Sequence, residues 1–351
     1  MYISMSTLFR RFIMNKSIFI GFDGYIDQIL YPVSSISSNQ DLKYFDTIAD
    51  FGQYLISKSG KSCNLQLLLK SKQLGGNGPI FGRTLKSLGC NIKIAGMFGA
   101  ESIHSTFSDI FDKDSIISFM DPMHTDALEF KDGKIMMCPM TSYINDPLTL
   151  LRKASEKASY TIDSAFSSDL CAFLNWGEIN FIQKLWEDIY KNYFEYSKPD
   201  KTKILFFDPA DISQRDSKEV NSMLNIIKSF SDKRYTILSI NENEATQIGI
   251  KLYNNTDIIF ILNRLQTDFH LDELVIHSNY KTISSVSGKF NELPTDHVEN
   301  PLISTGAGDN FNAGYCYGKL MEMSPIECIR TAHKVSAFYI TNARPAKKKD
   351  I

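Results

Sequence analysis

Short apolar runs alternate along most of this chain with stretches that repeat apolar residues every three or four positions. The strand-like runs are apolar at consecutive positions and include Lys16–Phe22, Asn91–Gly99, Leu170–Asn175, Lys203–Asp208, Tyr235–Ile240, Val275–His277 and Thr282–Ser287. Such runs are typical of strands that are covered on both faces. Helical spacing is found in Phe45–Ile56, Phe181–Tyr190, Val220–Phe230 and Ile326–Thr341. The alternation predicts βαβ units, an α/β fold and a mainly parallel central sheet.

A different pattern occurs between about residues 116 and 140. Thr125–Phe130 and Lys134–Cys138 flank Asp132-Gly133, a dipeptide that favours a two-residue hairpin turn. An antiparallel hairpin in an otherwise parallel arrangement indicates a small accessory sheet. We predict that residues of about 28–44 and 116–140 form a lid over a cleft, which would exclude water during a transfer reaction.

Length and composition narrow the possibilities further. The chain has 351 residues, of which 43% are hydrophobic and 22% charged, so residues 1–351 are expected to form a single large domain. The net charge of −2 creates no overall attraction to nucleic acid or to an anionic membrane. No apolar run is long enough to span a membrane, and no small-residue cleavage site follows Arg10 and Arg11. The six cysteines form no Cys-x-x-Cys pair, which favours free thiols and a cytoplasmic location.

The segment Gly306-Ala307-Gly308-Asp309 directly precedes a helical pattern. A glycine turn that opens a helix is a favourable anion site, because the first-turn amides lack partners and the helix dipole attracts negative charge. An acid at this place would repel a phosphate, unless it takes a proton from the hydroxyl that attacks this phosphate. The alternative is an ordinary helix start with Asp309 as a first-turn acid.

Two other polar groups follow predicted strands in the first half of the chain. Asp27 comes shortly after the first strand, where ligands of open α/β sheets bind. Gly75, Gly76 and Asn77 precede a helix; the glycines let a ligand approach the backbone, and the Asn77 amide can bond hydroxyls. The alternatives are a turn acid at Asp27 and a simple strand–helix turn at Gly75.

A third polar group, Asn241-Glu242-Asn243-Glu244, follows the strand Tyr235–Ile240. Its oxygens suit a hydrated Mg²⁺, which keeps several waters and takes few protein ligands. Alternatively, Glu244 is the capping-box acid of the next helix.

Taken in order, these residues resemble the PfkB (ribokinase-like) family of carbohydrate and nucleoside kinases over roughly residues 16–345. Gly75-Gly76-Asn77-Gly78 and Ser304–Asp309 are similar to the two signatures of that family, and Asn241-x-x-Glu244 to its Asn-x-x-Glu motif. Asp27 is similar to its substrate-binding acid. The resemblance implies a three-layer ribokinase-like α/β sandwich with a small β-sheet lid, which transfers the γ-phosphoryl group of ATP to a sugar hydroxyl.

The resemblance also implies a role for each motif. Asp309 is the expected general base, and the amides of Gly306, Ala307 and Gly308 form the anion hole. Mg²⁺ is expected to bind Asn241 and Glu244 through water molecules. The nucleotide is expected at Asn241, Thr305 and His277. The sugar is expected at Asp27, Gly75, Gly76 and Asn77.

Two departures keep other functions open. Ile303 replaces an Asp that the family usually has, and His277-Ser278-Asn279 stands where the family has Thr-x-Gly at the nucleotide site. A silent sugar or nucleotide sensor on the same fold and a nucleoside kinase are therefore alternatives. An oxidoreductase is disfavoured, because no complete Gly-x-Gly-x-x-Gly follows the first strand. Trp176 is either a stacking surface for substrate or a core residue. Exposed lid edges favour a homodimer through the lid.

Overall fold

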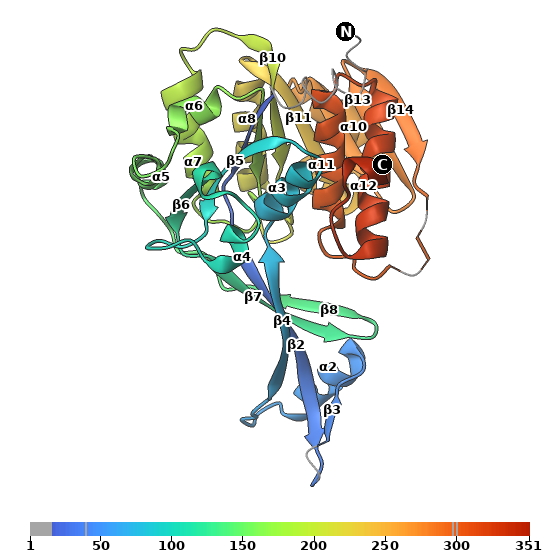
Figure 1. Ribbon diagram of the computed structural model, residues 1–351. Helices are drawn as coiled ribbons and strands as arrows, with labels where there is room; N and C mark the ends of the chain where they lie inside the picture. The colour runs from blue at the N-terminus through green and yellow to red at the C-terminus, as the bar shows by residue number, and fades with distance from the viewer. Residues whose placement is uncertain (1–15, 39–40, 297, 300) are drawn as a thin grey trace.

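The computed structural model describes residues 16–38, 41–296, 298–299 and 301–351. Arg10 and Arg11 lie outside the described residues, as do residues 39 and 40 of the predicted lid segment. Within the described part, the strands form one large and one small sheet, and the small sheet projects from the body of the molecule (Figure 1).

The large sheet has nine strands in the described residues and is mainly parallel. Their spatial order is β14 (Lys289–Pro294), β13 (Lys281–Val286), β12 (Glu273–His277), β11 (Arg234–Asn241), β10 (Asp200–Asp208), β9 (Leu170–Leu174), β1 (Ser17–Gly21), β5 (Asn91–Met97) and β6 (Ile116–Met120). All neighbours from β12 to β6 pair in parallel, whereas β13 and β14 pair antiparallel. The predicted α/β fold with a mainly parallel sheet is confirmed.

Helices cover both faces of this sheet. Successive residues of a strand point to opposite faces, so each strand contributes to two cores. Ile20 packs in the core beneath α3 (Asn77–Ser87), α11 (Ala307–Leu320) and α12 (Pro325–Asn342). Its neighbour Phe19 packs in a second core on the opposite face. That face carries α5 (Pro147–Ser155), α6 (Ile162–Phe166), α7 (Ile182–Ile189), α8 (Ser217–Ser231), α9 (Glu242–Tyr253) and α10 (Ile258–Asp268). Both faces of the strands are therefore buried, which explains their continuously apolar sequences and confirms three layers.

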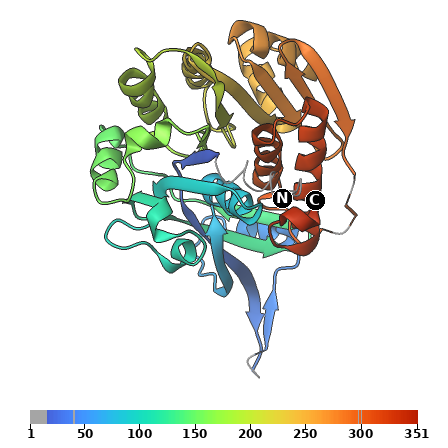
Figure 2. The same cartoon turned by 45° about the horizontal axis from the view of Figure 1, so that its top comes forward.

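The small sheet is built around the long strand β2 (Tyr25–Ile36), as Figure 2 shows from a second direction. It also contains β3 (Leu42–Tyr44), β4 (Leu67–Gly75), β7 (Met123–Phe130) and β8 (Gly133–Met137). The predicted hairpin is present, with Phe130 opposite Gly133. The helix α2 (Ile48–Ser57) places Phe51 against Leu30, Leu128 and Phe130 in a separate small core.

The predicted lid segments differ from the small sheet in two places. Residues 116–120 form β6, which pairs with β5 in the large sheet. Conversely, β4 belongs to the small sheet, where it pairs antiparallel with β2. The apolar run of β6 is suited to the buried edge of the body, whereas residues 67–72 of β4 are exposed on both faces.

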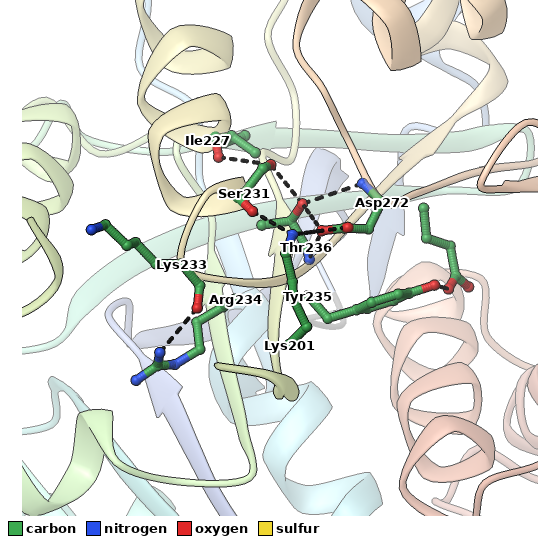
Figure 3. A network of polar contacts seen from close by, with 9 residues as sticks. Lys201, Ile227, Ser231, Lys233, Arg234, Tyr235, Thr236 and Asp272 are labelled. Carbon is green, nitrogen blue, oxygen red and sulfur yellow. Dashed lines mark hydrogen bonds and ion pairs between the residues drawn. The ribbon is translucent and has the colours of Figure 1, made fainter. Parts of the chain in front are cut away.

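The amino-terminal ends of the strands are joined by polar contacts (Figure 3). The Thr236 backbone amide and the Lys201 ammonium both donate to the Asp272 carboxylate, over 2.8 Å in each case. The hydroxyls of Ser231 and Thr236 are 2.7 Å apart. These contacts connect β10, β11 and the residue before β12 at the end remote from the strands' carboxyl termini, so they stabilise the sheet.

Two further predictions can be compared with the structure. All six cysteines are free, and four of them, Cys90, Cys171, Cys316 and Cys328, are buried. In the part of the chain that the structure describes, no helix combines the length and the apolarity needed to cross a membrane.

Candidate functional site

Polar side chains gather at the carboxyl ends of five neighbouring parallel strands. In the order β1, β9, β10, β11 and β12, these residues are Asp23, Asn175, Asp208, Asn241 and His277. The carboxyl ends of parallel strands meet at one edge of the sheet, which is where ligands of open α/β sheets bind. This edge is therefore the candidate active site.

Asp23 follows β1, at one end of this row of five strands, and is 1% exposed. Its carboxylate accepts hydrogen bonds from the Gly78 backbone amide at 2.8 Å and from Asn175 Nδ2 at 3.1 Å. A Cβ atom added to Gly78 would be 2.5 Å from Asp23 Oδ1, and one added to Gly76 would be 2.8 Å from Oδ2. These glycines are thus required for the first turn of α3 to close on the buried carboxylate. Burial raises the pKa of Asp23 to about 6.

Asp27 lies inside β2 and not in a turn, so the turn-acid alternative is wrong. It sits between Gln73 of β4 and Thr125 of β7 and is 5% exposed. A Cβ atom on Gly75 would be only 2.3 Å from its carboxylate. Burial raises the pKa of Asp27 to about 6, while a hydrogen bond from the Thr125 side chain opposes this rise.

Asp309 occupies the first turn of α11, after the Gly306 cap with φ of 85°. The Asn77 side chain at the start of α3 forms a hydrogen bond to its carboxylate. Thr84 Oγ1 donates to Asn310 Oδ1 over 2.7 Å and holds the same two helices together. The fold therefore brings the two sequence motifs, at 75–78 and 306–309, to one place.

The environment of Asp309 is unlike that of an ordinary helix-start acid. Burial is the largest cause that raises its pKa well above the usual range, followed by the negative charges of Asp208 and Asp23. An exposed first-turn acid has its pKa lowered by the helix dipole. A partly buried acid whose pKa is raised by burial and by neighbouring carboxylates is typical of a catalytic group.

Side chains of α11 and α12 fix the carbonyl groups of the turn before Asp309. The carbonyl oxygens of Thr305, Gly306 and Ala307 accept hydrogen bonds from the side chains of Tyr339, Asn310 and Ser336, respectively. The Ala307 amide donates to the Ser304 carbonyl over 3.1 Å. A phosphoryl oxygen would therefore compete with Ser304 for this one of the three predicted anion-hole amides.

Asn241 and Glu244 form the capping box that the sequence left as an alternative. Glu244 accepts from the Asn241 backbone amide at 2.8 Å and from Asn241 Nδ2 at 2.7 Å, and the Asn241 side chain accepts from the Glu244 amide. Glu244 is buried beside Asp208. Burial and the charge of Asp208 raise the pKa of Glu244 well above its ordinary value.

Asp23, Asn175 and Asp208 are not among the site residues that the sequence motifs predicted. Asp208 accepts from Asn312 Nδ2 and from the Ala210 amide, at 2.8 and 2.9 Å, and burial raises its pKa to about 6. The available signal was that each of the three ends a buried strand or follows its last residue within two positions. A single polar residue at a strand end is common and does not by itself indicate a site. These three residues become significant because their strands are neighbours in the sheet.

The acids at this edge can accommodate a hydrated dication. Asp208 and Glu244 are buried carboxylates; burial raises the pKa of both, and the charge of Asp208 raises that of Glu244 further, so a bound cation would favour their ionised forms. Within residues 16–38, 41–296, 298–299 and 301–351, no three His, Cys, Asp or Glu residues converge closely enough to hold a metal directly. This arrangement fits Mg²⁺ that is bound mainly through water.

His277 and Trp176, two other residues named from the sequence, lie in different surroundings. The His277 ring stacks on Phe311 with 4.6 Å between centroids, and its Cε1 would be 3.7 Å from a Cβ on Gly308. Burial lowers the pKa of His277 to about 4, and nearby His333 contributes to this shift. Trp176 is a core residue, buried and with its Nε1 donating to Gln183, so the stacking-surface alternative is wrong.

Comparisons of the sequence with known proteins identify the family of the chain. The family model of prokaryotic ketohexokinase matches residues 8–351. A ketohexokinase from Haloferax volcanii is 20% identical, over 93% of this chain and 88% of its own.

Solved structures agree in fold. The ribokinase of Thermotoga maritima has a TM-score of 0.63 at 13% identity, covering 95% of this chain and 97% of its own. A phosphofructokinase-2 variant from Escherichia coli has a TM-score of 0.66 at 11% identity, covering 95% and 96%. A nucleoside kinase from Burkholderia thailandensis has a TM-score of 0.60 at 14% identity, covering 95% and 98%.

The chain belongs to the prokaryotic ketohexokinase family. It is a PfkB-type carbohydrate kinase with the ribokinase fold, as the sequence motifs predicted.

Proposed function

We propose that this member of the prokaryotic ketohexokinase family transfers the γ-phosphoryl group of ATP to a hydroxyl of a ketohexose, with Asp309 as general base. One observation carries the proposal. A partly buried carboxylate with a raised pKa stands in the first turn of α11, directly after a left-handed glycine turn, and Asn77 contacts it from α3.

In the proposed reaction, the oxygen of the sugar hydroxyl forms a bond to the γ-phosphorus. The bond from this phosphorus to the β–γ bridging oxygen breaks, and its electron pair leaves with ADP. Asp309 accepts the hydroxyl proton, so it must be ionised beforehand. Backbone amides of Gly306, Ala307 and Gly308 stabilise the charge on the equatorial oxygens of the transferring group.

The sugar is proposed to bind at Asp27, Gly75, Gly76 and Asn77. Asp27 is supported by three strands of the small sheet, and Asn77 reaches Asp309 from the start of α3. A sugar between them would have its hydroxyls near both Asp27 and the base. The small sheet would then act as the lid of a single kinase domain and exclude water from the transfer.

The nucleotide is proposed to bind along the other side of the same edge, at Asn241, Thr305 and His277. Asn241 and Glu244 are proposed to hold Mg²⁺ through water, and Asp208 is close enough to Glu244 to raise its pKa. When bound, the metal supplies positive charge to the β- and γ-phosphate oxygens. The protein side chains contribute orientation: the capping box fixes the direction of both Asn241 and Glu244.

A second copy of this chain is the proposed partner of the small sheet. Apolar side chains are exposed on several of its strands, namely Ile36, Leu42, Tyr44, Leu67, Leu68, Leu69, Met136 and Met137. An exposed sheet with apolar side chains favours pairing with another sheet. Sedimentation of the wild type and a Leu67→Lys, Leu69→Lys variant tests the dimer; a wild-type monomer would exclude it.

The free cysteines further support a reducing, cytoplasmic location.

The function is tested by release of ADP from Mg·ATP in the presence of ketohexoses, aldohexoses and nucleosides. We expect turnover with a ketohexose at least tenfold above that with the other acceptors. Turnover only with nucleosides would replace the proposal with a nucleoside kinase. Sugar binding in calorimetry without ADP release for any acceptor would indicate a sensor.

A further inference from the structure

Arg83 is a cationic side chain of α3 whose contacts lead to the glycine turn of α11. It is partly buried, and its Nε atom is buried without a hydrogen-bond partner among the described residues. Its guanidinium lies over the Tyr339 ring of α12, with 5.9 Å from Cζ to the ring centroid. A buried N–H group without a hydrogen-bond partner costs free energy of folding. This cost points to a role for the Arg83 side chain other than stabilising the fold.

The Tyr339 hydroxyl connects this arginine to the turn. It donates to the Thr305 carbonyl over 3.1 Å and lies within 3.1 Å of the position of a Cβ on Gly306. Burial raises the pKa of the Tyr339 hydroxyl, and the positive charge of Arg83 opposes this rise. A chain of contacts thus runs from the Arg83 guanidinium over the Tyr339 ring, and from the Tyr339 hydroxyl to the peptide directly before Gly306.

The direction of this peptide decides what the turn can bind. A peptide unit is planar, so fixing the Thr305 carbonyl on the outer side also fixes the Gly306 amide on the opposite side. Gly306 has φ of 85°. Because glycine has no Cβ atom and its backbone adopts many conformations, the peptide before it could otherwise rotate. The hydrogen bond from Tyr339 therefore selects one of several peptide orientations.

We propose that Arg83 is a positioning residue that acts through the Tyr339 hydroxyl on the Thr305 peptide and thereby aims the Gly306 amide at the transferring phosphoryl group. Its positive charge polarises the hydroxyl and strengthens the bond to Thr305. This inference rests on the proposed phosphoryl transfer and adds two residues, Arg83 and Tyr339, to the machinery of that site. It assigns neither residue a contact with substrate.

The kinetic test compares Arg83→Met, which keeps the apolar stem of the side chain, with Tyr339→Phe, which removes only the hydroxyl. Each is expected to lower kcat by about 10–100-fold, the usual size for a residue that orients a catalytic group through another. The KM for the sugar should change less than kcat. Because the two residues act in series, the double variant should be no worse than the more damaging single variant. Lys86→Met is the matched control, since Lys86 lies on the same helix but pairs with Asp112.

A chemical rescue separates positioning from a merely structural role. Millimolar guanidinium ion should restore part of the kcat of Arg83→Ala and leave the Lys86→Met enzyme unchanged. An unchanged kcat in Arg83→Met, or strictly multiplicative effects in the double variant, would overturn the proposal.

A binding test does not depend on turnover and so distinguishes this inference from the proposed function. Sulfate, a tetrahedral dianion, should raise the Tm of the wild type and of Lys86→Met, and should raise it less in Arg83→Met and Tyr339→Phe. Equal sulfate effects in all four proteins would refute the role of Arg83 even in an active kinase. A loss confined to the Arg83 and Tyr339 variants would support it even if no sugar proved to be a substrate.

Discussion

The carboxylate of Asp23 accepts a 2.8 Å hydrogen bond from the backbone amide of Gly78, which fastens the end of β1 to the first turn of α3. Through this contact the sheet sets the position of Asn77, the residue directly before Gly78 in the helix, and Asn77 in turn contacts Asp309. The predicted base is therefore placed by a buried acid that does not itself belong to either sequence motif.

The first prediction concerns this contact. Gly78→Ala places a Cβ atom 2.5 Å from Asp23 Oδ1, so α3 must shift. We expect a loss of about 1–3 kcal/mol in the free energy of unfolding, the usual cost of overpacking, together with a loss of activity. Gly52→Ala in α2 is the control, because a Cβ there meets nothing within 4 Å. Urea unfolding of both variants checks the prediction, and equal stabilities would contradict it.

The second prediction concerns the proposed base. Asp309→Asn removes the proton acceptor but keeps the shape of the side chain, so kcat should fall by about 10²–10⁴-fold with little change in the KM for sugar. Asp50→Asn is the matched control, since Asp50 is also in the first turn of its helix but is exposed on α2. Steady-state ADP release measures both variants. An Asp309→Asn enzyme with the wild-type kcat would exclude the assignment.

The third prediction concerns the pH dependence of activity. The base must be ionised, so activity is lost as the pH falls through the pKa of Asp309, which burial and neighbouring negative charges raise. The charge of Glu178 contributes to the raised pKa of Asp23, Asp27, Asp208 and Asp309. Glu178→Gln removes this repulsion and should shift the acid limb of the kcat/KM profile to lower pH, most clearly at low ionic strength. A shift to higher pH would be inconsistent with this electrostatic coupling.

The fourth prediction concerns stability without ligands. The pKa of Asp27 is about 6 in the folded protein against 3.8 ordinarily, so between these values the folded state binds more protons than the unfolded state. The stability that this group contributes is complete below pH 3.8 and is lost as the pH rises through 6. The decline is at most about 3 kcal/mol. Unfolding of the wild type and of Asp27→Asn from pH 4 to 7 measures it; parallel curves would speak against a raised pKa.

The fifth prediction concerns a buried ion pair away from the site. Glu273 is 0% exposed, accepts from Tyr235 and Tyr315, and pairs with Lys319 at 2.7 Å. Lys319→Met leaves this carboxylate buried without its cation and should cost about 3–5 kcal/mol. Lys281→Met breaks the exposed pair with Glu292 and should cost less than about 1 kcal/mol. Denaturant unfolding would reveal the difference, and adding Glu273→Gln to Lys319→Met should recover part of the loss.

Local patterns predicted much of the fold. The apolar runs of β1, β5, β9, β10 and β11 indicated strands that are covered on both faces, and Asp132-Gly133 indicated the hairpin of β7 and β8. Where patterns were ambiguous, the prediction was wrong. Residues 116–120 belong to the large sheet, and β4 belongs to the small one. A short apolar run can pair with either sheet, since its partner is decided by contacts far along the chain.

The sequence by itself determined the strand–helix alternation, the glycine turn at 306–308, the acid after it and the family to which these motifs belong. These features depend on neighbouring residues, whose spacing fixes periodicity and turn geometry. Only the tertiary structure decided that Asp23, Asn175 and Asp208 lie together with Asp309, and that Tyr339 holds the Thr305 carbonyl. The order of strands in the sheet and the packing of α3 and α12 against α11 bring these residues together, and one local stretch of sequence does not encode that order.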